Sequence, residues 1–160
     1  MSPQETAAII AGLFGLVGVI STVVIACLGY FERKRNSLLD AVLRELSRFA
    51  GGRQERNIGV SIVGHFWGQV PELEGVFVRL LTNQGIYIIA EGDPEKAHEF
   101  SNMERIVWLL ASVPKSKTEY DQFYKELIDQ LTARKAMPPG TRVTYAVIDN
   151  WVDRLTKRRN

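Results

Sequence analysis

The pattern of apolar and polar positions divides the chain into two parts. Residues 7–31 contain no Asp, Glu, Lys or Arg, whereas apolar and charged residues are mixed with a helical period from residue 37 onward. A helix over the uncharged stretch would be about 37 Å long at about 1.5 Å per residue, and the hydrocarbon core of a bilayer is about 30 Å thick. The pattern predicts a transmembrane helix over residues 7–31, preceded by a short extracytoplasmic N-terminus, residues 1–6.

Charges on either side of the predicted span indicate its orientation. Arg33, Lys34 and Arg35 follow it closely, and Glu5 is the single charged side chain before it. Basic flanks remain on the cytoplasmic side, and a cleaved signal peptide begins with basic residues, which this chain lacks. We expect a single-pass protein of the cell (inner or plasma) membrane with its N-terminus outside. Residues 32–36 are then a basic juxtamembrane linker to a cytoplasmic domain, residues 37–160.

The segment before Cys27 leaves a minor alternative open. Residues 24–27, Val-Ile-Ala-Cys, resemble the run that precedes a lipoprotein cysteine. This resemblance implies an acyl group on Cys27 and a domain outside the cytoplasm. The basic start of such a signal is missing, so the transmembrane interpretation is favoured.

Small residues gather on one side of the predicted transmembrane helix. At about 100° per residue they project within roughly 80° of one another or at the edges of that arc, whereas Ile20 and Val24 lie on the opposite side. In lipid, helices associate by close van der Waals contact, which small residues permit. We predict a self-associating packing face made of Ala8, Ala11, Gly12, Gly15, Gly18, Thr22, Ala26 and Gly29.

Prolines and helical periodicity organise residues 37–160. Pro71, Pro94, Pro114 and the pair Pro138–Pro139 recur at about the length of a helix and its turn. Between them, apolar residues repeat at intervals of three and four, as one face of an α-helix requires. The predicted fold class is all-α: a transmembrane helix followed by a cytoplasmic helical bundle or short helical-repeat domain of about six helices. The expected helices occupy residues 37–52, 53–67, 71–92, 94–113, 117–137 and 141–160.

Two of these helices have recognisable starts. Ser37 is expected to cap the first, and Pro71 to occupy the first turn of the third. The third helix is predicted as the centre of the core because residues 86–90 are apolar on all sides; a short strand there is the alternative. The predicted core-facing residues of the second and third helices are Ile58, Ile62 and Phe66, and Leu73, Val76, Phe77, Leu80, Gln84 and Tyr87.

Residues 38–81 contain an amphipathic helix, a short turn with glycine, a second segment (QERNIGVSIVG) and a further helix (PELEGVFVRLL). This order resembles a helical repeat of the HEAT or armadillo kind. In such repeats an arginine early in the second helix often fixes the turn, and the resemblance places Arg56 in that role. A compact bundle produces the same pattern, so both arrangements stay open.

Composition limits the chemistry and the partners. One cysteine and two histidines exclude a disulfide framework and leave little for a metal site. The net charge of +2 is small, and aromatic residues are not interleaved with the basic ones, which argues against nucleic acid as a partner. Basic residues close to a membrane helix are attracted to anionic lipids. The predicted lipid-contacting residues are Arg33, Lys34, Arg35, Arg44 and Arg48.

Candidate catalytic residues are few. His98 and Glu99 share a predicted helix with Glu95 and Asn102, a set that suits acid–base chemistry. Their charged surroundings favour a solvated helix face instead. His65 stands beside Phe66 and Trp67 and is interpreted as a packed core or turn residue. Because no phosphate-binding loop or nucleophile motif is present, we expect no enzyme and no cofactor.

Two functional classes remain. In the first, the protein is an adaptor: the transmembrane helix self-associates, and the cytoplasmic domain binds another, unidentified protein. In the second, it is a membrane effector that oligomerises through its transmembrane helices and permeabilises the bilayer. Replacement of the span by polyleucine separates the two, because only the effector needs its small-residue face.

The packing face predicts which substitutions reduce self-association. Gly15→Leu and Gly18→Leu add bulk where two backbones approach, while the segment becomes more apolar and still inserts. We expect each to reduce crosslinked oligomers of the full-length protein about fivefold, which corresponds to about 1 kcal/mol of helix packing. Ile20→Leu and Val24→Leu, on the opposite side, are the controls and should have no effect. Equal oligomerisation in all four variants would show that the stripe is incidental.

Overall fold

The computed structural model describes residues 28–30, 32–42, 44–45 and 53–158, and the chain divides into two compact units between Leu43 and Arg44. In the first unit, residues 28–30 and 32–42 are helical. The expectation that Ser37 caps a helix is therefore wrong, because the helical backbone already includes residues 32–36 before it.

The predicted transmembrane span lies almost entirely outside these ranges, which it meets only at residues 28–30. Cys27 is outside them, as is every member of the small-residue packing face except Gly29. Among the residues that the structure does describe, no helix is both long and apolar enough to cross a bilayer. The span and its packing face thus stay predictions from sequence.

In its described part, the second unit contains α-helices and 3-10 helices and no strand, which confirms the all-α fold class. Residues 86–90, for which a strand was the alternative, form the end of a helix. The elements are α2 (Arg53–Phe66), η2 (Pro71–Leu73), α3 (Glu74–Ala90), α4 (Ala97–Ala111), η3 (Thr118–Tyr120), α5 (Asp121–Arg134) and α6 (Tyr145–Thr156).

Local sequence accounts for several helix ends. Pro71 opens the short helix η2, which leads directly into α3, as predicted. Thr144 caps α6, and its Oγ1 accepts a hydrogen bond from the backbone N–H of Val147 at 3.3 Å. Gly68 follows α2 with a φ of 78°, a conformation that is strained for residues with a Cβ.

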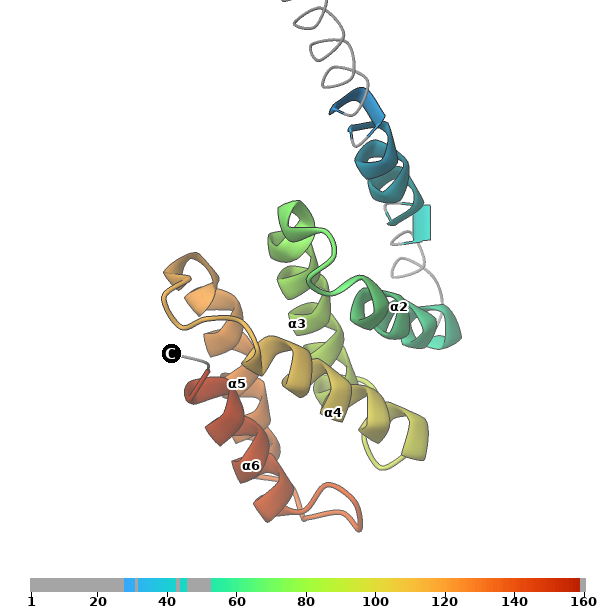
Figure 1. The fold of residues 1–160 in the computed structure, drawn as a ribbon. Coiled ribbons are helices and arrows are strands. Elements are labelled where there is room, and N and C mark those ends of the chain that lie inside the picture. The colour runs from blue at the N-terminus through green and yellow to red at the C-terminus, as the bar shows by residue number, and fades with distance from the viewer. Residues whose placement is uncertain (1–27, 31, 43, 46–52, 159–160) are drawn as a thin grey trace, which may run out of the picture. The chain divides into compact units, whose positions relative to one another are not determined.

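Helices α3 and α4 form the centre of the second unit. Helix α3 packs against α5 and α4, and α4 also packs against α2 and α6. Helix α2 lies on one side of this pair, and α5 and α6 lie on the other (Figure 1). The large side chains that are fully buried are Phe77, Leu81, Ile88, Met103, Ile106, Leu109, Leu110, Leu127, Leu131, Ile148, Trp151 and Leu155.

The prediction that α3 is the core helix is confirmed, but its buried face is wider than expected. Leu73, Phe77 and Gln84 are buried as predicted, whereas Val76 is 43% exposed. Residues that were not predicted to face the core, such as Leu81, are fully buried. The reason is that α3 is covered by α5 on one side and α4 on another, so no single narrow stripe describes it.

Glycine sets the separation of α3 and α5. A Cβ at Gly85 would lie 3.1 Å from Leu127 Cδ1 and 3.6 Å from Ile106 Cγ2. These distances leave no room for a larger side chain between α3, α4 and α5. The position is therefore fixed by packing rather than by helix propensity.

The C-terminal end of α6 is attached to α5. Arg158 is buried, donates a hydrogen bond to Asp121 Oδ1 at 2.5 Å and lies 3.8 Å above the ring of Tyr124. The Tyr124 hydroxyl donates to the carbonyl oxygen of Leu110 at 2.8 Å, and burial raises the pKa of Tyr124 to about 12. One chain of contacts thus joins α6, α5 and α4.

The glycines predict opposite responses to added bulk. Gly85→Val should destabilise the fold by about 1–3 kcal/mol, because the extra methyl groups overpack the junction with Leu127. A Cβ at Gly64 in α2 would be 3.6 Å from the Cδ atom of Arg105, so Gly64→Ala should stabilise the helix by about 0.5–1 kcal/mol. Thermal unfolding of the full-length variants in detergent measures both. A Gly85→Val protein as stable as the parent would contradict this account of the α3–α5 contact.

Candidate interaction surface

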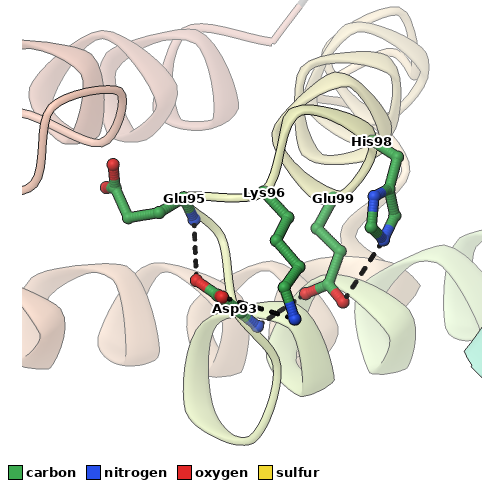
Figure 2. Close-up of polar contacts among 5 residues, drawn as sticks. All are labelled: Asp93, Glu95, Lys96, His98 and Glu99. Atoms are coloured by element: carbon green, nitrogen blue, oxygen red, sulfur yellow. Dashed lines mark hydrogen bonds and ion pairs between the residues drawn. The ribbon is translucent and has the colours of Figure 1, made fainter.

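The predicted acid–base residues lie in and after the turn between α3 and α4 (Figure 2). Glu99 is 1% exposed, and its Oε2 accepts a hydrogen bond from the backbone N–H of Asp93 at 2.6 Å. The Nε2 atom of His98 is 3.7 Å from the other carboxylate oxygen, and this imidazole is about half exposed. The prediction of a solvated face is therefore wrong for Glu99.

A glycine explains how Glu99 is accommodated. A Cβ on Gly92 would lie 2.5 Å from Glu99 Oε2, so the missing side chain leaves the space that the carboxylate occupies. Asn102, one turn further along α4, is also buried. Glu99 and Asn102 are therefore part of the buried interior. The Glu99 carboxylate attaches the start of α4 to the backbone of the α3–α4 turn.

Glu95 has a separate role, and Figure 2 shows its side chain pointing away from Glu99. Its carboxylate accepts hydrogen bonds from the backbone N–H groups of Arg142 and Val143, at 2.8 and 2.9 Å. The Thr141 hydroxyl donates a third, at 3.1 Å. Glu95 thereby attaches the α3–α4 turn to the loop between α5 and α6.

The same contacts affect the ionisation of Glu95. The hydrogen bond from the Arg142 backbone, followed by those from Val143 and Thr141, holds the pKa of this carboxyl below its ordinary value of 4.5, against the opposing effect of partial burial. The negative charge is thus part of the native contact. Within the part of the chain that the structure describes, no group of three His, Cys, Asp or Glu side chains has a metal-binding arrangement.

Helices α2 and α4 enclose a groove of about 280 Å³ that the sequence did not suggest. Each helix contributes three residues at the spacing i, i+3, i+4, which places them on one helical face. The two helices lie close together at Gly64, where a Cβ would be 3.6 Å from Arg105 Cδ and 3.8 Å from Leu109 Cδ1, both ordinary van der Waals distances. The lining residues are Ser61, Gly64, His65, Arg105, Trp108 and Leu109.

Trp108 is the exposed large apolar residue of this groove. Its side chain is 61% exposed, although Val107 and Leu109 beside it are fully buried. On α2, Ile58 was predicted to face the core and is instead 41% exposed, whereas Val63 is fully buried. Ile58 is on the same face of α2 as Ser61 and His65, so the apolar surface continues beyond the groove.

The histidine and tryptophan at the end of α2 have different surroundings. His65 is exposed in the last turn of α2 and makes an edge contact with Phe66 at 4.9 Å between ring centroids. It is therefore not a packed core residue, and the turn that was the alternative begins two residues later, at Trp67. Trp67 donates a hydrogen bond from Nε1 to Ser112 Oγ at 2.9 Å and stacks on Phe77. Trp67 therefore fixes the end of α2 against α3 and the end of α4, which keeps the groove in shape.

The predicted lipid-contacting residues are distributed over both units. Arg33, Lys34 and Arg35 are exposed on the helix of the first unit, and Arg44 is exposed in the second. Arg48 and the side chain of Arg56 lie outside the described residues. Lipid contact by these residues stays a prediction.

Comparisons of the chain with protein-family models, with curated proteins and with solved structures found no match. The resemblance of residues 38–81 to HEAT or armadillo repeats therefore rests on the sequence pattern alone.

The contacts of Glu95 predict a pH-dependent stability difference. Since its pKa is lowered in the folded state, the unfolded chain binds the proton more readily, and the stabilisation is present above pH 4.5 and lost as the pH falls through the folded pKa. Glu95→Gln should be less stable than the parent by on the order of 1 kcal/mol near neutral pH. The difference should shrink in acid.

Thermal unfolding of both proteins across this pH range makes the comparison. Glu119→Gln, which removes the same charge from an exposed position in η3, is the control. A constant difference between the Glu95→Gln protein and the parent at every pH would contradict a contact that depends on the carboxylate charge.

Proposed function

We propose that the protein is a single-pass membrane adaptor: a self-associating transmembrane helix holds it at the membrane, and the helical domain binds another protein on the cytoplasmic side. The observation that carries the proposal is the exposed Trp108 beside a groove between α2 and α4. Isolated exposed apolar residues are common, but a tryptophan at a concave site next to an arginine is typical of a protein-binding hot spot.

The dimensions of the groove favour a protein partner over a small molecule. Its volume of about 280 Å³ is at the lower limit of ligand pockets, which are roughly 300–1,000 Å³. A stable protein interface covers about 800 Å² on each partner. A partner seated on Trp108 would therefore extend over neighbouring surface, which includes the exposed Ile58 on α2.

The membrane part of the proposal rests on the sequence of residues 7–31 and its flanks. Arg33, Lys34 and Arg35 would lie at the cytoplasmic surface, where each basic residue gains about 1 kcal/mol from anionic lipid. Tethering would confine the partner search to the membrane surface and raise the local concentration of the binding domain.

The small-residue packing face supports a second candidate, the membrane effector. In this case, assembly of the transmembrane helices is the activity, and the helical domain controls it. Activity of a chain with a polyleucine span, which keeps the anchor and removes the packing face, would exclude the effector and leave the adaptor.

Truncation of the groove tryptophan tests the adaptor directly. Trp108→Ala should weaken binding of the protein that co-purifies with the full-length chain in mild detergent by about 30-fold or more, the effect of losing a hot-spot side chain worth at least about 2 kcal/mol. The thermal stability should change little, since most of the Trp108 surface is already exposed.

Val76→Ala removes an exposed apolar side chain from α3 and should leave binding unchanged. Unaltered binding by Trp108→Ala, or equal losses in both variants, would contradict the assignment of the groove.

A further inference from the structure

We infer that the α2–α4 groove binds an acidic, amphipathic segment of another protein, which places an apolar side chain on Trp108 and a carboxylate on Arg105. This inference rests on the proposed function and adds the chemistry of the partner.

The charge of the groove is the first argument. Arg105 and His65 are its titratable lining residues, and none of the described residues that line it is acidic. The Nη1 atom of Arg105 donates to the hydroxyl oxygen of Ser61 at 2.8 Å. A guanidinium has five N–H donors, and a serine hydroxyl carries no charge. The contact therefore orients Arg105 without neutralising it.

Several other arginines and lysines of the second unit contact carboxylates. Arg154 contacts Glu104, Arg158 contacts Asp121 and Lys117 contacts Glu74. Glu104 precedes Arg105 in the chain, but its carboxylate accepts hydrogen bonds from Trp151 and Arg154 on α6. The acid closest in sequence is thus held on the side of α4 that faces α6, and the charge of Arg105 is available to a partner.

The arrangement of the side chains indicates the form of the partner segment. Arg105 and Trp108 are three residues apart on α4 and lie on one helical face. A partner helix presents an apolar residue and a carboxylate at the same spacing, three or four residues apart. Leu109 also lines the groove but is fully buried, so the apolar contact that α4 offers to a partner is made by Trp108. The guanidinium of Arg105 and the indole ring of Trp108 therefore match the carboxylate and the apolar side chain of an acidic amphipathic helix.

A protein segment fits these observations better than an anionic membrane surface. A membrane attracts several exposed cations on a broad face, whereas here one arginine is oriented within a concave site by a hydrogen bond to the opposite helix. A second copy of this chain is a further candidate occupant, and the oligomeric state of the Trp108→Ala protein tests it.

Selection of peptides from a displayed random library tests the inference. The full-length protein in detergent micelles is the bait, and the Trp108→Ala protein is used for counter-selection. We expect the retained peptides to carry Asp or Glu within one helical turn of Leu, Ile, Phe or Trp. Arg105→Gln should weaken the best of them about tenfold or more, because it removes a charge-assisted hydrogen bond.

Matched changes show whether the two charges meet. Replacing the acidic residue of the peptide by its amide should cause a similar loss, and the two changes together should cost less than their sum, as a double-mutant cycle requires for interacting groups. Lys125→Gln, which removes one exposed positive charge from α5, is the control and should not alter binding by more than the general effect of net charge.

Several outcomes would overturn the inference. Peptides that need Trp108 but are neutral or basic, or that bind the Arg105→Gln protein equally well, would leave the proposed function standing and remove the acidic partner. Failure to retain any peptide would remove the acidic partner as well. Displacement of the peptides by phosphatidylglycerol added to the micelles would assign the surface to lipid, and a smaller oligomer of Trp108→Ala would assign it to a second copy. The Trp108→Ala binding test on the co-purified partner separately decides the proposed function.

Discussion

The close contact of α3 with α5 at Gly85 is the constraint on which the second unit depends. Leu127 of α5 and Ile106 of α4 both approach this glycine, so one position without a side chain lets three helices meet. Helix α4 is thereby laid against α3, and its outer face receives α2 on one side and α6 on the other. The groove between α2 and α4 depends on this arrangement, because the packing of α4 against α3 positions α4 beside α2.

Two carboxylates secure the ends of the central helices. Glu99 accepts the backbone N–H of Asp93 in the α3–α4 turn, and Glu95 accepts two backbone N–H groups and a hydroxyl from the α5–α6 loop. Gly92 and Gly140 leave the space for these side chains. Glu95 and Glu99, which the sequence suggested as acid–base residues, thus make contacts that stabilise turns. The side chains that are available to a partner, Arg105 and Trp108, lie in the groove between α2 and α4.

Local signals in the sequence were sufficient to predict the α-helices of the second unit, α2 to α6. Pro71 and the three-to-four spacing of apolar residues located α3, whereas the last helix was predicted from residue 141 and begins only at Tyr145, after the cap Thr144. The faces were predicted less well, because a helix buried on two sides, such as α3, has no single apolar stripe. Ile58 was assigned to the core for a different reason. The spacing of apolar residues shows that α2 is amphipathic, but its packing against α4 decides which of these residues are buried.

The candidate site was beyond the reach of the sequence pattern. Trp108 lies in an apolar run, residues 106–111, and the composition of this run does not show which of its side chains is exposed. Its exposure follows from the crossing of α4 with α2 and α6, a non-local feature. The sequence does not distinguish Arg105 from other surface arginines. Only the structure shows that its guanidinium is oriented by a hydrogen bond to Ser61 on the opposite helix. By contrast, the membrane anchor can be predicted from the sequence, because the prediction depends only on the composition of residues 7–31 and their flanks.

The central claim is that the partner covers Trp108, and fluorine NMR of the full-length protein tests it most directly. The chain has three tryptophans, so 5-fluorotryptophan labelling gives three signals, which Trp108→Phe and the corresponding variants assign. When the co-purified partner is added, the Trp108 signal should shift and lose its sensitivity to exchange of H₂O for D₂O, while the signal of the buried Trp151 stays in place. A Trp108 signal that remains unchanged and solvent-exposed at saturating partner would contradict the account.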